Sequence, residues 1–249
     1  MSHDHVGIPK FIQKKFSKNN QVYCYDYIRK KEYYVSIDRL GVEKNYYEKN
    51  VEINILSNDI ENRFAPFFDK YLKNDNSQNK LIMLLENEKL VIEFLIFMIY
   101  RSKKYLSKIN GESIINNTIT PLNHSELLRY LNDEKVKIID NNSDFRCFHI
   151  INKTNEPFIN NSIGFAFFKT RTNEEVYYMP LNLTEGLFIT NVSDIICNVD
   201  GFIESESNLI IESLNEKISI YEKNNGNGFI FGYDMKSVQK YVNLFENKK

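Results

Sequence analysis

Apolar residues recur along the chain with two different periods, and these periods predict its helices and strands. Two short runs rich in Tyr and Val, at 22–26 and 32–37, predict a β-hairpin near the N-terminus. From 51 to 72 the apolar residues return every three or four positions, which predicts an amphipathic helix. Pro66 lies inside this pattern, and because proline removes a backbone donor we expect a kink or a break there.

The apolar segment that follows predicts a second helix. It runs over about 80–109 and ends before Gly111, a residue type that commonly stops a helix. Asn123 is a suitable N-cap for a short third helix over 125–131. Together these segments predict a helical block over about 51–131.

The pattern changes after residue 134, where short aromatic or β-branched runs alternate with Asn, Asp and Pro. These runs predict strands at 136–139, 145–151, 158–159, 163–168, 176–179 and 186–190. A helix is predicted over 204–223, and a strand at 229–231 follows a Gly-Asn-Gly turn. Asp234 is placed to cap a last helix that reaches Glu246.

These elements predict an α+β fold rather than an alternating α/β one. Two or three helices form a central block, flanked by a mostly antiparallel sheet, an N-terminal hairpin and C-terminal helices. The 249 residues contain no internal repeat and no long linker, so we expect a single domain over 1–249. Its helical block covers about 51–131 and its strand-rich part about 135–232.

Charge and composition narrow the classes of partner. Lys and Arg number 32 against 33 Asp and Glu, so no global field favours nucleic acid or an anionic membrane. Two local clusters of basic residues have two interpretations, either solvated helix faces or contacts for nucleic acid or nucleotide. The residues are Lys14, Lys15, Lys18, Arg101, Lys103 and Lys104.

Several features predict a cytoplasmic protein. The three cysteines, Cys24, Cys147 and Cys197, are widely spaced and odd in number, which is typical of reduced core residues. The chain does not open with the charged-then-apolar pattern of a secretory signal. The strongest apolar run, 90–100, is about half the length needed to span a bilayer and contains Glu93, so we expect no membrane contact.

Familiar catalytic and cofactor motifs do not occur in the sequence. It has no phosphate loop, no His-Glu-x-x-His zinc pair, no nucleophile elbow and no Cys-x-x-Cys pairs. His3-Asp4-His5 could bind a metal through the amino end, but His5 held by the Gly7–Pro9 kink is the more interesting feature. We therefore predict no metal site, and the sequence points to no cofactor.

Glu61 and Arg101 stand out as charged residues on otherwise apolar helices. A buried charge is costly unless it is paired, so an ion pair between them that holds two helices together is one interpretation. In the other, Arg101 binds an anion and His5 or Glu61 moves a proton, which makes these three residues catalytic candidates. Glu93 is a further possible partner for Arg101.

These residues also follow the order of a known family pattern. The matching positions are His5, Pro9, Phe11, Phe16, Val22 to Asp26, Asn45-Tyr46-Tyr47, Ile60-Glu61, Arg101, Glu156-Pro157-Phe158-Ile159, Tyr178-Met179-Pro180-Leu181 and Leu214-Asn215. In this order and spacing the chain resembles, over nearly its whole length, the bacterial family called domain of unknown function 4238.

Two departures from the family pattern concern the site. His5 stands four residues before Pro9, where many members have three. Where the family commonly has Thr-Ser-Asp-Asn-Pro after Phe-Ile, this chain has Asn160-Asn161-Ser162-Ile163-Gly164, so Ser162 replaces the carboxylate. From the resemblance, Asn160, Ser162 and Asn215 are candidate substrate-binding residues.

The resemblance implies an immune or toxin-like role, because members are similar to accessory genes of mobile elements and some are associated with defence against bacteriophage. We expect a cytosolic anti-phage effector, with a nuclease-like hydrolase acting on nucleic acid or nucleotide as its enzymatic form. The alternative is a non-enzymatic sensor or protein-binding module. The sequence does not predict the oligomeric state.

Overall fold

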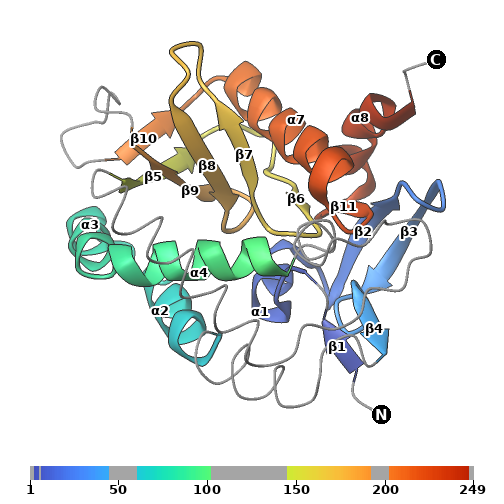
Figure 1. Ribbon diagram of the computed structural model, residues 1–249, viewed down its shortest axis with the longest axis horizontal. Helices are drawn as coiled ribbons and strands as arrows, with labels where there is room; N and C mark the ends of the chain where they lie inside the picture. The colour runs from blue at the N-terminus through green and yellow to red at the C-terminus, as the bar shows by residue number, and fades with distance from the viewer. Residues whose placement is uncertain (1–2, 6, 45–60, 102–144, 192–201, 247–249) are drawn as a thin grey trace, which may run out of the picture.

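The computed structural model describes residues 3–5, 7–44, 61–101, 145–191 and 202–246. Within these residues the chain forms an α+β fold, as predicted, with mostly antiparallel sheets (Figure 1). A four-stranded sheet, a five-stranded sheet and a small two-stranded one are joined by helices. The predicted helix at 125–131 and strand at 136–139 lie outside the described residues.

The four-stranded sheet brings together three distant parts of the chain. Its order is β3 (Lys31–Ser36), β2 (Gln21–Asp26), β11 (Phe229–Gly232) and β6 (Asn160–Asn161). All of its pairings are antiparallel. The predicted N-terminal hairpin is therefore confirmed as β2–β3, and the C-terminal strand β11 pairs with it.

The five-stranded sheet is built from the middle of the chain. Its order is β10 (Phe202–Ser205), β5 (Arg146–Asn152), β9 (Glu185–Thr190), β8 (Glu175–Pro180) and β7 (Ala166–Lys169). Only the pairing of β10 with β5 is parallel. The strands predicted at 145–151, 176–179 and 186–190 are confirmed.

The strand predicted at 158–159, and the first half of the one at 163–168, were wrong. Their backbone N–H groups bind other partners: Phe158 donates to the carbonyl of Leu183, and Ile159 to the side chain of Asn215. Ile163 and Gly164 both donate to Oδ1 of Asn161. Side-chain acceptors thus replace a neighbouring strand in this segment.

The helices are α1 (Lys10–Gln13), the 3₁₀ turn η1 (Lys14–Phe16), α2 (Asn62–Leu72), α3 (Ser77–Glu86), α4 (Glu88–Tyr100), α7 (Asn208–Asn225) and α8 (Met235–Glu246). A single helix was predicted over 80–109, and its part up to Tyr100 was wrong, because Asn87 separates α3 from α4; residues 102–109 lie outside the described residues. The φ of Asn87 is −121°, and its Nδ2 donates to the carbonyl of Met83 at 2.8 Å. In contrast, α2 continues through Pro66 without the expected break. Asp234 accepts from the backbone N–H of Ser237, which confirms the predicted cap.

Helices cover the sheets from different sides. α3 and α4 contact β5, α7 contacts β7 and β10, and α8 contacts β2 and β11 (Figure 1). Aromatic rings fill the space between α2 and α4, where Phe64 and Phe94 stack with centroids 3.7 Å apart. Within the described residues, the structure has no helix with the length and apolarity needed to cross a membrane.

The N-terminal segment is docked into the fold, as its sequence indicates. Strand β1 (His3–His5) pairs with β4 (Val42–Lys44), and Ile8, Ile12 and Phe16 are fully buried. The N–H of Ile8 donates to the carbonyl of Ser162 at 2.7 Å. The start of the chain is thus fixed against its middle.

Candidate functional site

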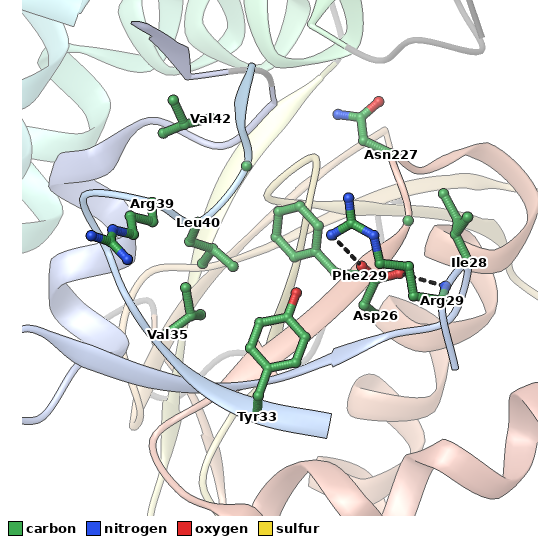
Figure 2. A pocket seen from close by; sticks show the side chains of 12 residues that line it. Asp26, Ile28, Arg29, Tyr33, Val35, Arg39, Leu40, Val42, Asn227 and Phe229 are labelled. Atoms are coloured by element: carbon green, nitrogen blue, oxygen red, sulfur yellow. Dashed lines mark hydrogen bonds and ion pairs between the residues drawn. The ribbon is translucent and has the colours of Figure 1, made fainter. Parts of the chain in front are cut away.

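A cavity of about 410 Å³ lies beside the N-terminal hairpin, a size typical of small-molecule sites. We call it the hairpin cavity, and Figure 2 shows its walls. Its lining residues are Asp26, Ile28, Arg29, Tyr33, Val35, Arg39, Leu40, Gly41, Val42, Asn227, Gly228 and Phe229. The pairing of β2 with β11 brings the N-terminal and C-terminal parts of this lining together.

The turn between β2 and β3 holds Arg29, one of the two arginines that line the cavity, in place. The carboxylate of Asp26 accepts the backbone N–H of Arg29 at 2.9 Å and pairs with its guanidinium at 3.3 Å. The N–H of Tyr27 donates to the carbonyl of Gly228, which ties this turn to the opposite wall. Arg29 is therefore exposed but anchored at its base.

Both polar and apolar groups line the hairpin cavity. Figure 2 shows Arg29, the hydroxyl of Tyr33 and the amide of Asn227 on one side, with Arg39 on the opposite side. Burial raises the pKa of Tyr33, the Cys24 and Asp26 groups add to this, and nearby Arg29 acts against them. The apolar part of the lining comes from Ile28, Val35, Leu40, Val42 and Phe229.

Directly behind the cavity wall lies a fully buried carboxylate, that of Glu222 on α7. It accepts hydrogen bonds from the N–H groups of Gly228 and Phe229, at 2.7 and 3.0 Å. It also accepts from the N–H and the hydroxyl of Ser162, at 3.1 and 2.7 Å. Burial raises the pKa of Glu222 to about 7, although these hydrogen bonds act in the opposite direction.

Glu61 and Arg101, predicted from the sequence, are brought together at the edge of this region. Their side chains form an ion pair that joins α2 to α4, and the guanidinium also lies over the ring of Phe97. The Arg101 side chain is 1% exposed and that of Glu61 is 25% exposed. Arg101 also approaches the cavity wall, because its carbonyl accepts from the amide of Asn227 at 3.4 Å.

Replacing Arg101 with methionine should lower the free energy of unfolding by about 1–3 kcal/mol, because a buried cation and its pair are lost while Glu61 can still reach water. Urea denaturation of both proteins measures this difference. The matched control is Arg63→Met, since Arg63 also pairs with a carboxylate, that of Glu93, but is itself exposed. Equal stability of the Arg101 variant and the wild type would contradict a structural ion pair.

The third catalytic candidate, His5, is placed by its backbone alone. In the β1–β4 pairing it lies opposite Val42, which lines the hairpin cavity. Two residues later, Gly7 passes next to the carbonyl of Ser162 and the amide of Asn227. The strand that carries His5 therefore lies next to a strand that lines the cavity.

The three substrate-binding candidates are fully buried and do not line the cavity. Asn160 donates to the carbonyl of Pro180, and Ser162 binds Glu222 and the N–H of Asn227. Asn215 accepts from Ile159 and donates to the carbonyl of Pro157 and to Tyr241. Each of them satisfies backbone groups of other segments of the fold.

Sequence reasoning missed Glu222 and the hairpin residues Arg29 and Tyr33. A signal for Glu222 was present, because it follows Ile211, Asn215 and Ile218 at the spacing of one buried helix face. A carboxylate on such a face needs partners, which the Gly-Asn-Gly turn supplies.

A second polar cluster fastens α2 and α3 to the five-stranded sheet. Oε2 of Glu185 lies 2.9 Å from Nε2 of His149 and 2.7 Å from Nζ of Lys80. The hydroxyl of Tyr71 lies 2.6 Å from Nδ1 of His149. Burial lowers the pKa of His149 against the raising effect of Glu185, so the ring is neutral at pH 7. None of these residues lines the hairpin cavity.

Among the described residues, no three His, Cys, Asp or Glu side chains are grouped so that they could hold a metal ion. The described cysteines, Cys24 and Cys147, are buried free thiols whose pKa burial raises. The hairpin cavity itself has a lining of both polar and apolar side chains.

Fold and site together define an α+β protein with a small-molecule-sized cavity at a sheet edge. The family model described as protein of unknown function (DUF4238) matches residues 5–140, more than half of the chain. The chain therefore belongs to this family, as the pattern in its first 140 residues indicates. The pattern positions at 156–215 lie outside the matched residues. Neither a curated protein nor a solved structure matches the chain.

Proposed function

We propose that this protein binds a nucleotide in the hairpin cavity and acts in the bacterial cytoplasm as a ligand-responsive protein of anti-phage defence. The observation that carries the proposal is the lining of the cavity, in which Arg29, Tyr33 and Asn227 lie on one side (Figure 2). The expected association of the family with phage defence supports the cellular role.

The phosphate of a nucleotide suits the arginines. A guanidinium has five N–H donors, and Asp26 occupies only part of those of Arg29. The hydroxyl of Tyr33 beside it can donate to the same anion, and Arg39 is a second arginine among the lining residues. Charge-assisted hydrogen bonds of this kind contribute about 1.5–3 kcal/mol each.

The remaining lining suits a base and a sugar. Phe229 and Tyr33 provide aromatic rings on which a planar base can pack, next to Leu40 and Val42. The amide of Asn227 can both donate to and accept from the edge of a base. An anion without an aromatic part would leave this apolar wall uncovered.

A mononucleotide fits these observations better than a nucleic-acid polymer does. The cavity, of about 410 Å³, has small-molecule dimensions, whereas binding of a polymer depends on many phosphate contacts. The net charge of −1 also provides no extended field for a polyanion.

The burial and the ion pair of Arg101 favour a protein that binds its ligand without catalysis. A phosphate-binding catalytic arginine must reach its substrate, and this guanidinium is buried and paired with Glu61. We therefore favour the sensor over the hydrolase.

The hydrolase remains the second candidate because the strand of His5 lies next to a strand that lines the cavity. Bacteria that express the wild type or His5→Ala, challenged with phage, distinguish the two. Equal protection removes His5 from any catalytic role, and selective loss with normal folding favours hydrolysis.

Replacing Arg29 with alanine should weaken binding of ADP by about 10- to 100-fold, because one charge-assisted contact to phosphate is lost. Isothermal titration calorimetry of the wild type and the variant measures this. The matched control is Lys31→Ala, since Lys31 is exposed on the same hairpin but does not line the cavity. Equal affinity of wild type and Arg29→Ala would contradict the site, and tighter binding of a single-stranded oligonucleotide than of ADP would contradict the ligand.

A further inference from the structure

The wall of the hairpin cavity formed by residues 227–229 has an unusual backbone. Its three successive N–H groups all point away from the cavity, toward the buried centre behind it. The N–H of Asn227 donates to Oγ of Ser162 at 2.7 Å, while those of Gly228 and Phe229 donate to Glu222. Successive N–H groups that face one point form a concave anion site, and here the anion is a side chain of the protein itself.

The position of Glu222 is fixed from several directions. Its carboxylate holds both the 227–229 wall and Ser162, whose carbonyl in turn binds Ile8 of the docked N-terminal segment. Its own carbonyl accepts from the hydroxyl of Tyr27, in the hairpin turn, and from the N–H of Gly226. The carboxylate of Glu222 therefore connects α7 to β11 and to the segment after β6, and its backbone carbonyl adds the β2–β3 turn.

We propose that Glu222 is a positioning residue of the hairpin cavity: its ionised carboxylate holds residues 227–229 in the conformation that binds the ligand. The ligand is the nucleotide proposed above, so the binding part of this inference rests on that function. Glu222 does not line the cavity, and it acts through the backbone of Gly228 and Phe229.

Protonation of Glu222 then couples the cavity to pH. Its pKa of about 7, raised by burial, makes the carboxylate titrate in the neutral range. The titratable groups around it are Cys24 and Tyr27 on the β2 side and Tyr221 on α7. Burial is the largest cause that raises the pKa of each of these groups, and the charge of Glu222 adds to it. All three groups therefore stay neutral at pH 7. When Glu222 takes up a proton, its hydrogen bonds lose their charge assistance and the wall loosens.

The first test follows the wall itself and needs no ligand. In NMR spectra of the wild type between pH 5.5 and 8.5, the amide signals of Gly228 and Phe229 should shift with a midpoint near pH 7. In Glu222→Gln the midpoint should be absent. The control is Glu216→Gln, an exposed residue of the same helix, which should titrate like the wild type. Amide signals that stay constant over this range in the wild type would overturn the proposal.

The second test measures binding of ADP by calorimetry at pH 8 and pH 6. Glu222→Gln should bind about tenfold more weakly than the wild type at pH 8, and most of this difference should be lost at pH 6. Protonation of the phosphate affects both proteins equally and cancels in this comparison. Equal affinities at pH 8 would overturn the positioning role. If the wild type does not bind ADP while the amide signals still titrate, the proposed ligand is wrong and the control of the wall by Glu222 stands.

Discussion

Replacing Gly7 with alanine is expected to lower the free energy of unfolding by about 3–4 kcal/mol, among the largest effects of any single methyl group in this chain. Gly7 has a φ of +91°, which residues with a side chain rarely adopt. Its added Cβ would lie 2.0 Å from the carbonyl oxygen of Ser162 and 2.7 Å from the amide nitrogen of Asn227. The first of these is backbone, so it cannot swing aside.

Chemical denaturation of the purified proteins measures this effect. Gly41→Ala is the control, because Gly41 also has a positive φ, of +66°, and should cost only about 1 kcal/mol for its backbone conformation. A Gly7 variant no less stable than the Gly41 variant would show that the N-terminal segment is not packed against Ser162.

Replacing Gly226 with alanine should lower the free energy of unfolding by about 3 kcal/mol, for a different reason. The φ of Gly226 is −83°, which any residue adopts, so the backbone is not strained. The added Cβ would instead lie 1.9 to 2.0 Å from the carboxyl atoms of Glu222. That carboxylate could move only by breaking its hydrogen bonds to Ser162, Gly228 and Phe229.

A double-mutant cycle isolates this collision. In a Glu222→Ala background the carboxylate is gone, so adding Gly226→Ala should cost less than about 0.5 kcal/mol. Glu216→Ala, on the exposed face of the same helix, serves as the background control and should leave the full cost. The same cost in both backgrounds would mean that the Glu222 carboxylate does not occupy the place next to Gly226.

The parts of the fold that could be predicted are those in which local pattern and tertiary contacts agree. The hairpin β2–β3 and strands β5, β8 and β9 have aromatic or β-branched residues and lie in regular ladders. The segment 158–165 has the same composition, but the local side chain of Asn161 and the distant side chain of Asn215 accept its N–H groups, and the second acceptor is brought there by tertiary packing. The division of the helix at Asn87 likewise depends on one side chain that binds its own helix.

The candidate site could be predicted only in part, because long-range pairing assembles it. The spacing of charges on apolar helices predicted that Glu61 and Arg101 could pair, and they do. The hairpin cavity depends on the pairing of β2 with β11, about 200 residues apart in sequence, which no local pattern contains. Helical periodicity could have predicted that Glu222 lies on a buried helix face. The sequence alone does not show that its partners are the N–H groups of the cavity wall.

The central claim is that the hairpin cavity binds a nucleotide, and chemical-shift mapping with ADP tests it most directly. Titration of ADP into the isotope-labelled protein should shift the amide signals of Asp26 to Val35, Gly41 and Val42, and Asn227 to Phe229, which surround the cavity. Signals of β5 and β9, around the His149 cluster, should not change. Shifts confined to residues away from the cavity, or no shifts at millimolar ADP, would contradict the account.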